Sequence, residues 1–132
     1  MTLSEIKVLV GRSDRAWSKA VEEMLVPRGI RSLVASSAGE AVDILAGSRI
    51  HMALVDIDSQ VVNGLSIVRA VRGYEPMLPC IMASARCERP MLSRALALDV
   101  FSVIAKPLDM VILQRQLNRL FIKKYNSYVF SD

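Results

Sequence analysis

The chain has 132 residues, of which 52% are hydrophobic and 23% are charged. This length predicts a single domain with a substantial core, and this composition excludes an intrinsically disordered chain. The formal net charge is +4, but no run of like charge is longer than the pair Lys123–Lys124. We therefore expect a solvated basic surface and no nucleic-acid partner.

The compartment is indicated by the apolar stretches, the first residues and the cysteines. Each apolar stretch is interrupted well before the roughly 18 residues that a membrane span requires. Glu5 and Lys7 fall where a signal peptide would have its apolar core. Cys80 and Cys87 lack metal-binding or redox spacing, which predicts two buried, reduced thiols. We expect a cytoplasmic protein without a membrane partner.

In chain order, short apolar runs alternate with stretches that carry apolar residues at helical spacing. The runs are nearly continuous, which is typical of strands buried on both faces of a parallel sheet. They predict five strands: Ile6–Val10, Ile30–Ala35, Met52–Val55, Cys80–Ala83 and Phe101–Ala105.

Each predicted strand is followed by one predicted helix. The first helix has Trp17, Val21 and Met24 on one face and stops before Pro27 and Gly29. The other four are predicted over these positions: Ala38–Ala46 before Gly47, Leu65–Val71 before Gly73, Met91–Leu96, and Leu108–Phe121.

Five β–α units of this kind predict an α/β fold, a three-layer, doubly wound sheet of five parallel strands. Right-handed crossovers place the helices on both faces of that sheet. Ligands of such folds bind at the carboxyl ends of the strands. The residues that follow the strands are therefore the candidates for function.

Three polar residues follow three of the predicted strands. Asp56 follows the third strand, Ser84 the fourth and Lys106 the fifth. A carboxylate can attack a phosphoryl group as a nucleophile, and the charged phosphoryl oxygens then need cations and hydroxyl donors. The sequence thus predicts a phosphoryl-transfer site that consists of Asp56, Ser84 and Lys106.

The segment from His51 to Leu65 resembles a known family, the receiver domains of two-component response regulators. Asp56 falls at that family's phosphorylated aspartate, and Asn63-Gly64 falls at the turn that opens the third helix. The resemblance extends over residues 6–120, nearly the whole chain. It implies a flavodoxin-like sheet with strand order 2-1-3-4-5.

Two later pairs of residues support the resemblance. Ser84-Ala85 resembles the family's Ser/Thr-Ala pair at the end of the fourth strand. Lys106-Pro107 resembles its Lys-Pro pair, whose peptide bond is commonly cis. The resemblance implies that a partner histidine kinase phosphorylates Asp56, with magnesium as the cofactor.

The acidic pair that holds magnesium in this family is replaced in this chain. Receivers carry two acidic residues after the first strand, where this sequence has Arg12-Ser13. Protein carboxylates usually hold magnesium, and Asp56 is the residual ligand here. Asp14 is expected to be the N-cap of the first helix rather than a ligand. We therefore expect magnesium only if Asp56 is phosphorylatable, and we predict that magnesium-dependent phosphotransfer is impaired.

Two interpretations of Arg12 are open. In the first, Arg12 and Lys106 bracket Asp56 and take the place of magnesium, since a nearby positive charge favours the ionised carboxylate. In the second, the Arg12 side chain points to solvent.

Two further positions depart from the family pattern. Ser59-Gln60 stand where receivers usually have Met-Pro, and Val103 stands at the position of the aromatic switch residue of the fifth strand. Phe101, two residues before Val103, is expected in the core. Such departures indicate an atypical receiver, or pseudo-receiver.

The remaining predictions concern domain limits and surfaces. We predict a receiver-like domain over 1–124 and a tail over 125–132, which packs back, docks on a neighbour or leads into a longer chain. His51 is expected in a surface loop. The fourth helix, fifth strand and fifth helix form the family's usual partner face. Its basic residues suit an acidic signalling protein or a symmetric homodimer: Arg86, Arg89, Arg94, Arg115, Arg119, Lys123 and Lys124.

Two functions remain in competition. The first is a signalling module without enzyme activity, whose output is protein–protein interaction. The second is a small phosphatase that resembles the haloacid dehalogenases, with Asp56 as the nucleophile and Asp58 as the acid/base. Two β–α units precede Asp56, whereas that motif normally follows the first strand of its fold, and this argues against the phosphatase.

Overall fold

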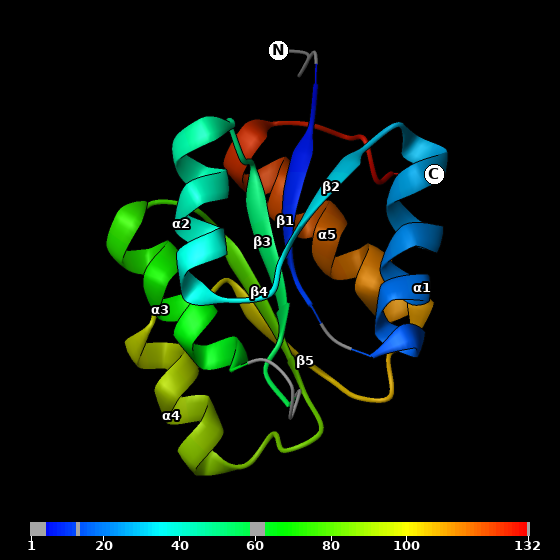
Figure 1. Ribbon diagram of the computed structural model, residues 1–132. Coiled ribbons are helices and arrows are strands. Elements are labelled where there is room, and N and C mark those ends of the chain that lie inside the picture. The colour runs from blue at the N-terminus through cyan, green and yellow to red at the C-terminus, as the bar shows by residue number, and fades with distance from the viewer. Residues whose placement is uncertain (1–4, 13, 59–62, 132) are drawn as a thin grey trace.

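A computed structural model describes residues 5–12, 14–58 and 63–131. Within these residues, five strands alternate with five α-helices, and a 3-10 turn, η1, follows the first helix (Figure 1). In chain order the elements are β1 (Lys7–Gly11), α1 (Arg15–Leu25), η1 (Val26–Arg28), β2 (Arg31–Ala35), α2 (Ala38–Gly47), β3 (Met52–Asp56), α3 (Gly64–Tyr74), β4 (Cys80–Ser84), α4 (Arg89–Ala97), β5 (Ser102–Ala105) and α5 (Met110–Tyr125).

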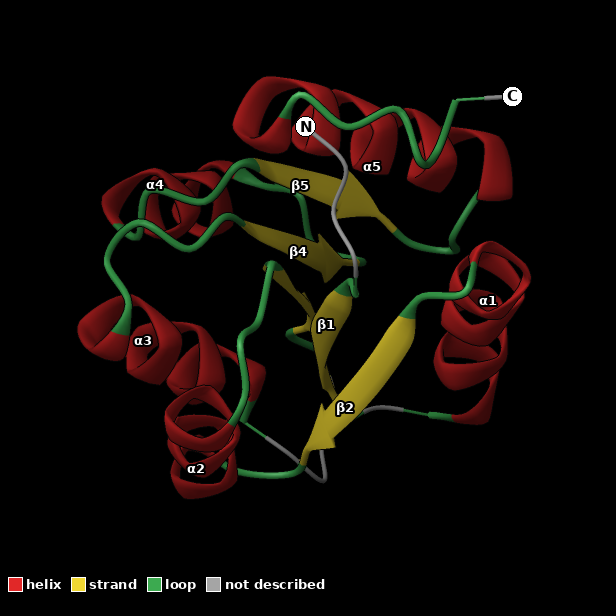
Figure 2. Cartoon of the chain, turned by 90° about the horizontal axis from the view of Figure 1, so that it is seen from above, coloured by secondary structure: helices red, strands yellow, loops and turns green. Residues whose placement is uncertain are grey.

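The five strands form one parallel sheet in the order β2-β1-β3-β4-β5. Helices α1 and α5 cover one face, and α2, α3 and α4 cover the other (Figure 2). Every residue of β3 and β4 is buried, because these strands lie inside the sheet with helices on both sides. The predicted three-layer, doubly wound α/β fold is confirmed.

The hydrophobic core lies in two layers, one on each face of the sheet. The layer under α1 and α5 includes Trp17 and Phe121, and the layer under α2, α3 and α4 includes Ile67 and Met82. Alternate residues of β1 belong to different layers, since successive side chains of a strand point to opposite faces. The sheet is thus fixed from both sides, and its carboxyl edge is held as a rigid platform.

Four helices, α1, α2, α3 and α5, begin at a side chain that accepts a hydrogen bond from the first turn. Asp14 caps α1 through the backbone N–H of Trp17, Ser37 caps α2 and Asp109 caps α5. Such caps satisfy N–H groups that have no partner inside the helix. The predicted role of Asp14 as an N-cap is confirmed.

Glycine at position 64 allows α3 to start directly against the end of β3. A Cβ atom there would lie 2.5 Å from the carbonyl oxygen of Asp56 and 2.7 Å from the Cα of Ile57. Both atoms belong to the backbone, so any side chain would push the two segments apart. Asn63 precedes it as the cap of α3, and its side chain accepts from the N–H of Ser66.

The residues after α5 pack back onto the domain. Phe130 is fully buried beside Phe121, with ring centroids 5.2 Å apart, and its carbonyl oxygen accepts a hydrogen bond from Gln114. Of the three alternatives for the tail, the structure shows the first. The division into a domain over 1–124 and a tail over 125–132 stays a prediction.

Two smaller predictions were wrong. His51 is only 3% exposed, because its Nδ1 accepts the backbone N–H of Lys7 at 3.1 Å and Tyr125 packs edge-on against its ring. Burial lowers the pKa of His51, and the positive charge of Arg49 adds to this effect. Cys80 is buried as expected, but Cys87 is exposed.

Among the described helices, none is long and apolar enough to cross a bilayer.

Candidate functional site

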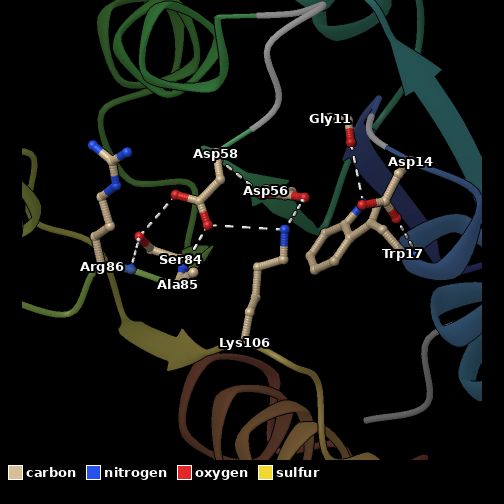
Figure 3. Close-up of polar contacts among 9 residues, drawn as sticks. All are labelled: Gly11, Asp14, Trp17, Asp56, Asp58, Ser84, Ala85, Arg86 and Lys106. Atoms are coloured by element: carbon tan, nitrogen blue, oxygen red, sulfur yellow. Dashed lines mark hydrogen bonds and ion pairs between the residues drawn. The ribbon is translucent and has the colours of Figure 1, made fainter.

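Asp56 is the last residue of the central strand, β3, and is 1% exposed. Its Oδ1 accepts the backbone N–H of Asp58 at 2.9 Å, and its Oδ2 accepts the Lys106 ammonium at 2.7 Å (Figure 3). A buried carboxylate is costly unless it is paired and hydrogen-bonded. Asp56 meets both conditions through Lys106 and the turn that follows β3.

Lys106 reaches Asp56 from two strands away. It follows β5, and β4 lies between β5 and β3, a separation of about 10 Å between the outer strands. A four-carbon side chain spans that distance, whereas a short polar residue would not. The Lys106–Pro107 peptide bond is cis, as the resemblance implied. The backbone N–H of Lys106 donates to the Ser84 carbonyl, which fixes where the side chain starts.

The pKa of Lys106 is raised. Burial acts to lower it, but the hydrogen bond to Asp56 and the negative charges of Asp56, Asp58 and Asp14 outweigh that effect. Lys106 is therefore a fixed positive charge over the whole neutral range. Its stabilising contribution is lost only when the pH rises through its raised pKa.

Ser84 ends β4, is fully buried and directly follows Ala83, the register partner of Asp56 in β3. Its hydroxyl donates to Asp58 Oδ1 at 3.0 Å, and its oxygen accepts the backbone N–H of Arg86 at 2.9 Å. The other oxygen of Asp58 accepts the backbone N–H of Ala85 and lies 3.8 Å from Lys106 Nζ. Asp58 thus joins β4 to β3 across the site (Figure 3).

The structure brings together the three residues that the strand-end positions predicted, Asp56, Ser84 and Lys106. The Ala85 N–H was not predicted, since a backbone donor leaves no mark in the sequence. Asp58 was predicted only as the acid/base of the phosphatase alternative. The signal for Asp58 was its spacing, two residues beyond a buried strand that ends in an aspartate.

Arg12 lies elsewhere than the bracketing hypothesis requires. Its side chain is exposed, and its guanidinium donates to Ser36 Oγ at 3.3 Å, at the start of the connection from β2 to α2. Among the described residues, the ion pair of Asp56 is with Lys106. The prediction of an Arg12–Asp56 contact is therefore wrong, because the neighbouring β2 edge offers the guanidinium a hydroxyl partner. Ser13 and Ser59-Gln60 lie outside the described residues.

The carboxylate oxygens at this edge of the sheet do not fit a dedicated magnesium site. Magnesium needs oxygen ligands in near-octahedral geometry, usually with one or two carboxylates free to coordinate it. Here both oxygens of Asp56 accept hydrogen bonds, and so do both oxygens of Asp58. The Asp14 carboxylate caps α1, and Arg12 supplies no carboxylate and binds Ser36 instead.

The fifth strand contains no aromatic side chain that could swing into the site. Val103 is half-buried and packs with the core layer under α4. Phe101 precedes the strand, packs against the opposite layer as expected, and lies under the cationic groups of Arg119 and Lys123.

The model of the response regulator receiver domain matches residues 8–118 of this chain. The chain belongs to the response regulator receiver family. Receiver structures share its fold: a receiver protein from Pseudomonas putida is 26% identical with a TM-score of 0.76, and covers 89% of this chain and 99% of its own. A CheY-like receiver from Methanospirillum hungatei is 19% identical with a TM-score of 0.77, and covers 94% and 100%.

Among curated proteins, the Regulator of RpoS from Escherichia coli is 23% identical over 114 residues, which are 86% of this chain. This receiver spans about a third of the length of that relative, 32%. The phosphatase alternative is not favoured, since the family match and the strand order place Asp56 at the end of the third strand of a receiver sheet.

Proposed function

We propose that this chain is a receiver-like signalling domain of a two-component phosphorelay, with protein–protein interaction as its output. The Asp56 carboxylate attacks the phosphorus of a phosphohistidine on a partner kinase. A P–O bond forms, the P–N bond breaks, and its electron pair stays on the imidazole, which takes up a proton from water. Lys106 and Ser84 then stabilise the new phosphoryl oxygens.

One observation carries the proposal. Lys106 Nζ lies 2.7 Å from Asp56 Oδ2 at the carboxyl edge of a receiver sheet. A buried carboxylate held by a fixed cation is ready to act as a nucleophile, and the same cation compensates the charge that phosphorylation adds. The engaged oxygens of Asp56 and Asp58 support the further proposal that magnesium-dependent transfer is impaired.

The test is intact-mass measurement after incubation with acetyl phosphate, with and without magnesium. We expect a slow increment of about 80 Da per chain, little changed by magnesium and absent in Asp56→Asn. Asp43→Asn, an exposed carboxylate on α2, is the matched control and should be modified like the wild type.

Two results would contradict this proposal. No increment, under conditions that modify an ordinary receiver, would make the domain independent of phosphorylation. A fast increment that strictly requires magnesium would show that metal-assisted transfer is intact. Turnover of a generic phosphate ester by the wild type, lost in Asp58→Asn, would revive the phosphatase alternative and contradict the proposal that this chain is not an enzyme.

For the output we propose the face formed by α4, β5 and α5, with an acidic signalling protein or a second copy as the partner, in the cytoplasm and without nucleic acid or membrane. Exposed apolar side chains lie on both helices of this face, Leu96 at 82% and Val111 at 64% exposed. Arg94 and Arg115 add positive charge beside them. Light scattering on the wild type and Leu96→Asp tests the homodimer, which the aspartate should dissociate.

A further inference from the structure

Asp58 has no role in the proposed phosphotransfer, yet its side chain makes several contacts at the site. Its carboxylate accepts the Ser84 hydroxyl and the Ala85 N–H, and lies 3.8 Å from the Lys106 ammonium. Its own backbone N–H donates to Asp56. The Asp58 carboxylate therefore bridges three donors, one of which, Lys106, pairs with Asp56, and it does so from the turn that follows β3.

The direction of the Ser84 hydroxyl follows from its two partners. Because its oxygen already accepts the N–H of Arg86 at 2.9 Å, its proton is directed to Asp58 Oδ1 at 3.0 Å. Ser84 is fully buried, so no water competes freely for that proton. The hydroxyl is thus held on the Asp58 carboxylate, beside the Lys106 ammonium that pairs with Asp56.

A hydroxyl, a backbone N–H and an ammonium that converge on one point form a set of donors suited to the oxygens of an anion. A phosphoryl group on Asp56 would present its oxygens to the nearest donors, and these are the same three. In the unmodified chain, the two carboxylate oxygens of Asp58 already lie against these three donors. The phosphoryl oxygens and the Asp58 carboxylate are thus competitors for one set of hydrogen bonds.

We propose that Asp58 is a tethered substitute for the phosphoryl group: its carboxylate occupies the phosphoryl-oxygen position of the receiver site. It holds Ser84 and Ala85 in the arrangement that a phosphoryl group would otherwise be needed to hold. It also slows phosphorylation of Asp56, because its hydrogen bonds must break first. The slower phosphorylation of Asp56 rests on the proposed function, whereas the hold on Ser84 and Ala85 does not.

The first test needs no phosphorylation. We expect the backbone amide resonance of Ala85, in ¹H–¹⁵N spectra of the unmodified chain, to move strongly upfield in Asp58→Ala, because a hydrogen bond to a charged acceptor is lost. Asp58→Asn, which keeps an acceptor of the same shape without its charge, should give an intermediate shift. Asp43→Asn should leave the resonance in place. An Ala85 amide that does not respond to either Asp58 variant would overturn the inference.

The second test uses the acetyl phosphate assay. Freeing a hydroxyl and an N–H from a charged acceptor should raise the rate of Asp56 modification by roughly tenfold in Asp58→Ala. An equal rate in Asp58→Ala and the wild type would overturn the competition. If no variant is modified at all, the proposed phosphotransfer fails, and the Ala85 resonance alone decides the role of Asp58.

Discussion

Asp56 and Lys106 form an ion pair, so a change at either residue removes the charged partner of the other. The Asp56 side chain is fully buried, whereas the Lys106 side chain keeps 21% of its surface exposed. Removing the cation would leave a buried carboxylate without its ammonium partner. We therefore expect the pair to contribute to stability as well as to the proposed chemistry.

We expect Lys106→Met to lower the free energy of unfolding at neutral pH by about 1–3 kcal/mol, since a buried charge loses its partner. The measurement is urea denaturation, run as a double-mutant cycle with Asp56→Asn. In the Asp56→Asn background the same change should cost much less. An equal cost in both backgrounds would mean that Lys106 stabilises the fold through its packing and not through the ion pair.

The sequence predicted Asp56, Ser84 and Lys106 because parallel topology gathers strand ends at one edge, whatever the intervening residues are. It did not predict the contacts of Asp58 or Arg12. Both lie just beyond a strand, where the direction of a side chain depends on the turn and on partners distant in the sequence. Asp58 contacts residues 26 and 27 positions away, and Arg12 contacts one 24 positions away.

At the scale of elements, the entry to β3 is joined to β1 and α5 through His51. Its ring accepts the Lys7 N–H on one side, and its carbonyl accepts the Tyr125 hydroxyl at the end of α5. Burial and the charge of Arg49 lower the pKa of His51 from its ordinary value of 6.5. The folded chain therefore binds this proton less tightly than the unfolded chain does.

The free energy of unfolding should accordingly fall as the pH drops below about 6.5, by up to ~1.4 kcal/mol per pH unit for one proton. Urea denaturation between pH 5 and 7.5 measures this dependence, and His51 is the single histidine of the chain. His51→Asn keeps an acceptor near Nδ1 but cannot titrate in this range. The same slope in His51→Asn would assign the dependence to other groups.

The elements themselves were predicted closely, since their apolar runs are continuous and their ends carry glycine, proline or a cap. β1, β3 and β4 each extend one residue further than predicted, to Gly11, Asp56 and Ser84. The reason is that backbone pairing continues through a residue that is not part of the apolar run at each tip. Hydrophobicity therefore marks the apolar part of a strand, while the ladder of hydrogen bonds marks its end.

At the scale of the whole molecule, the segment after α5 completes a core layer. Phe130 is fully buried against Phe121, and the Arg28 guanidinium lies 5.4 Å from the centre of its ring. Gln114 and Asn118 of α5 bind the backbone and the side chain of this segment. The last turn of chain is thus part of the packed structure and not an appendage.

Phe130→Ala should lower the free energy of unfolding by about 3 kcal/mol, through lost burial and the cavity that remains. Tyr128→Ala, two residues earlier and 61% exposed, should change it by less than about 0.5 kcal/mol. Urea denaturation compares the two. Equal small effects would show that the segment is detached in solution.

The site is built from residues that are far apart along the chain. Lys106 is 50 positions from Asp56, and Ser84 is 26 positions from Asp58. During synthesis, the ribosome releases Asp56 long before its ammonium and hydroxyl partners emerge. A nascent or misfolded chain therefore presents an ordinary aspartate, and phosphorylation of Asp56 would select for molecules whose last strand has already joined the sheet.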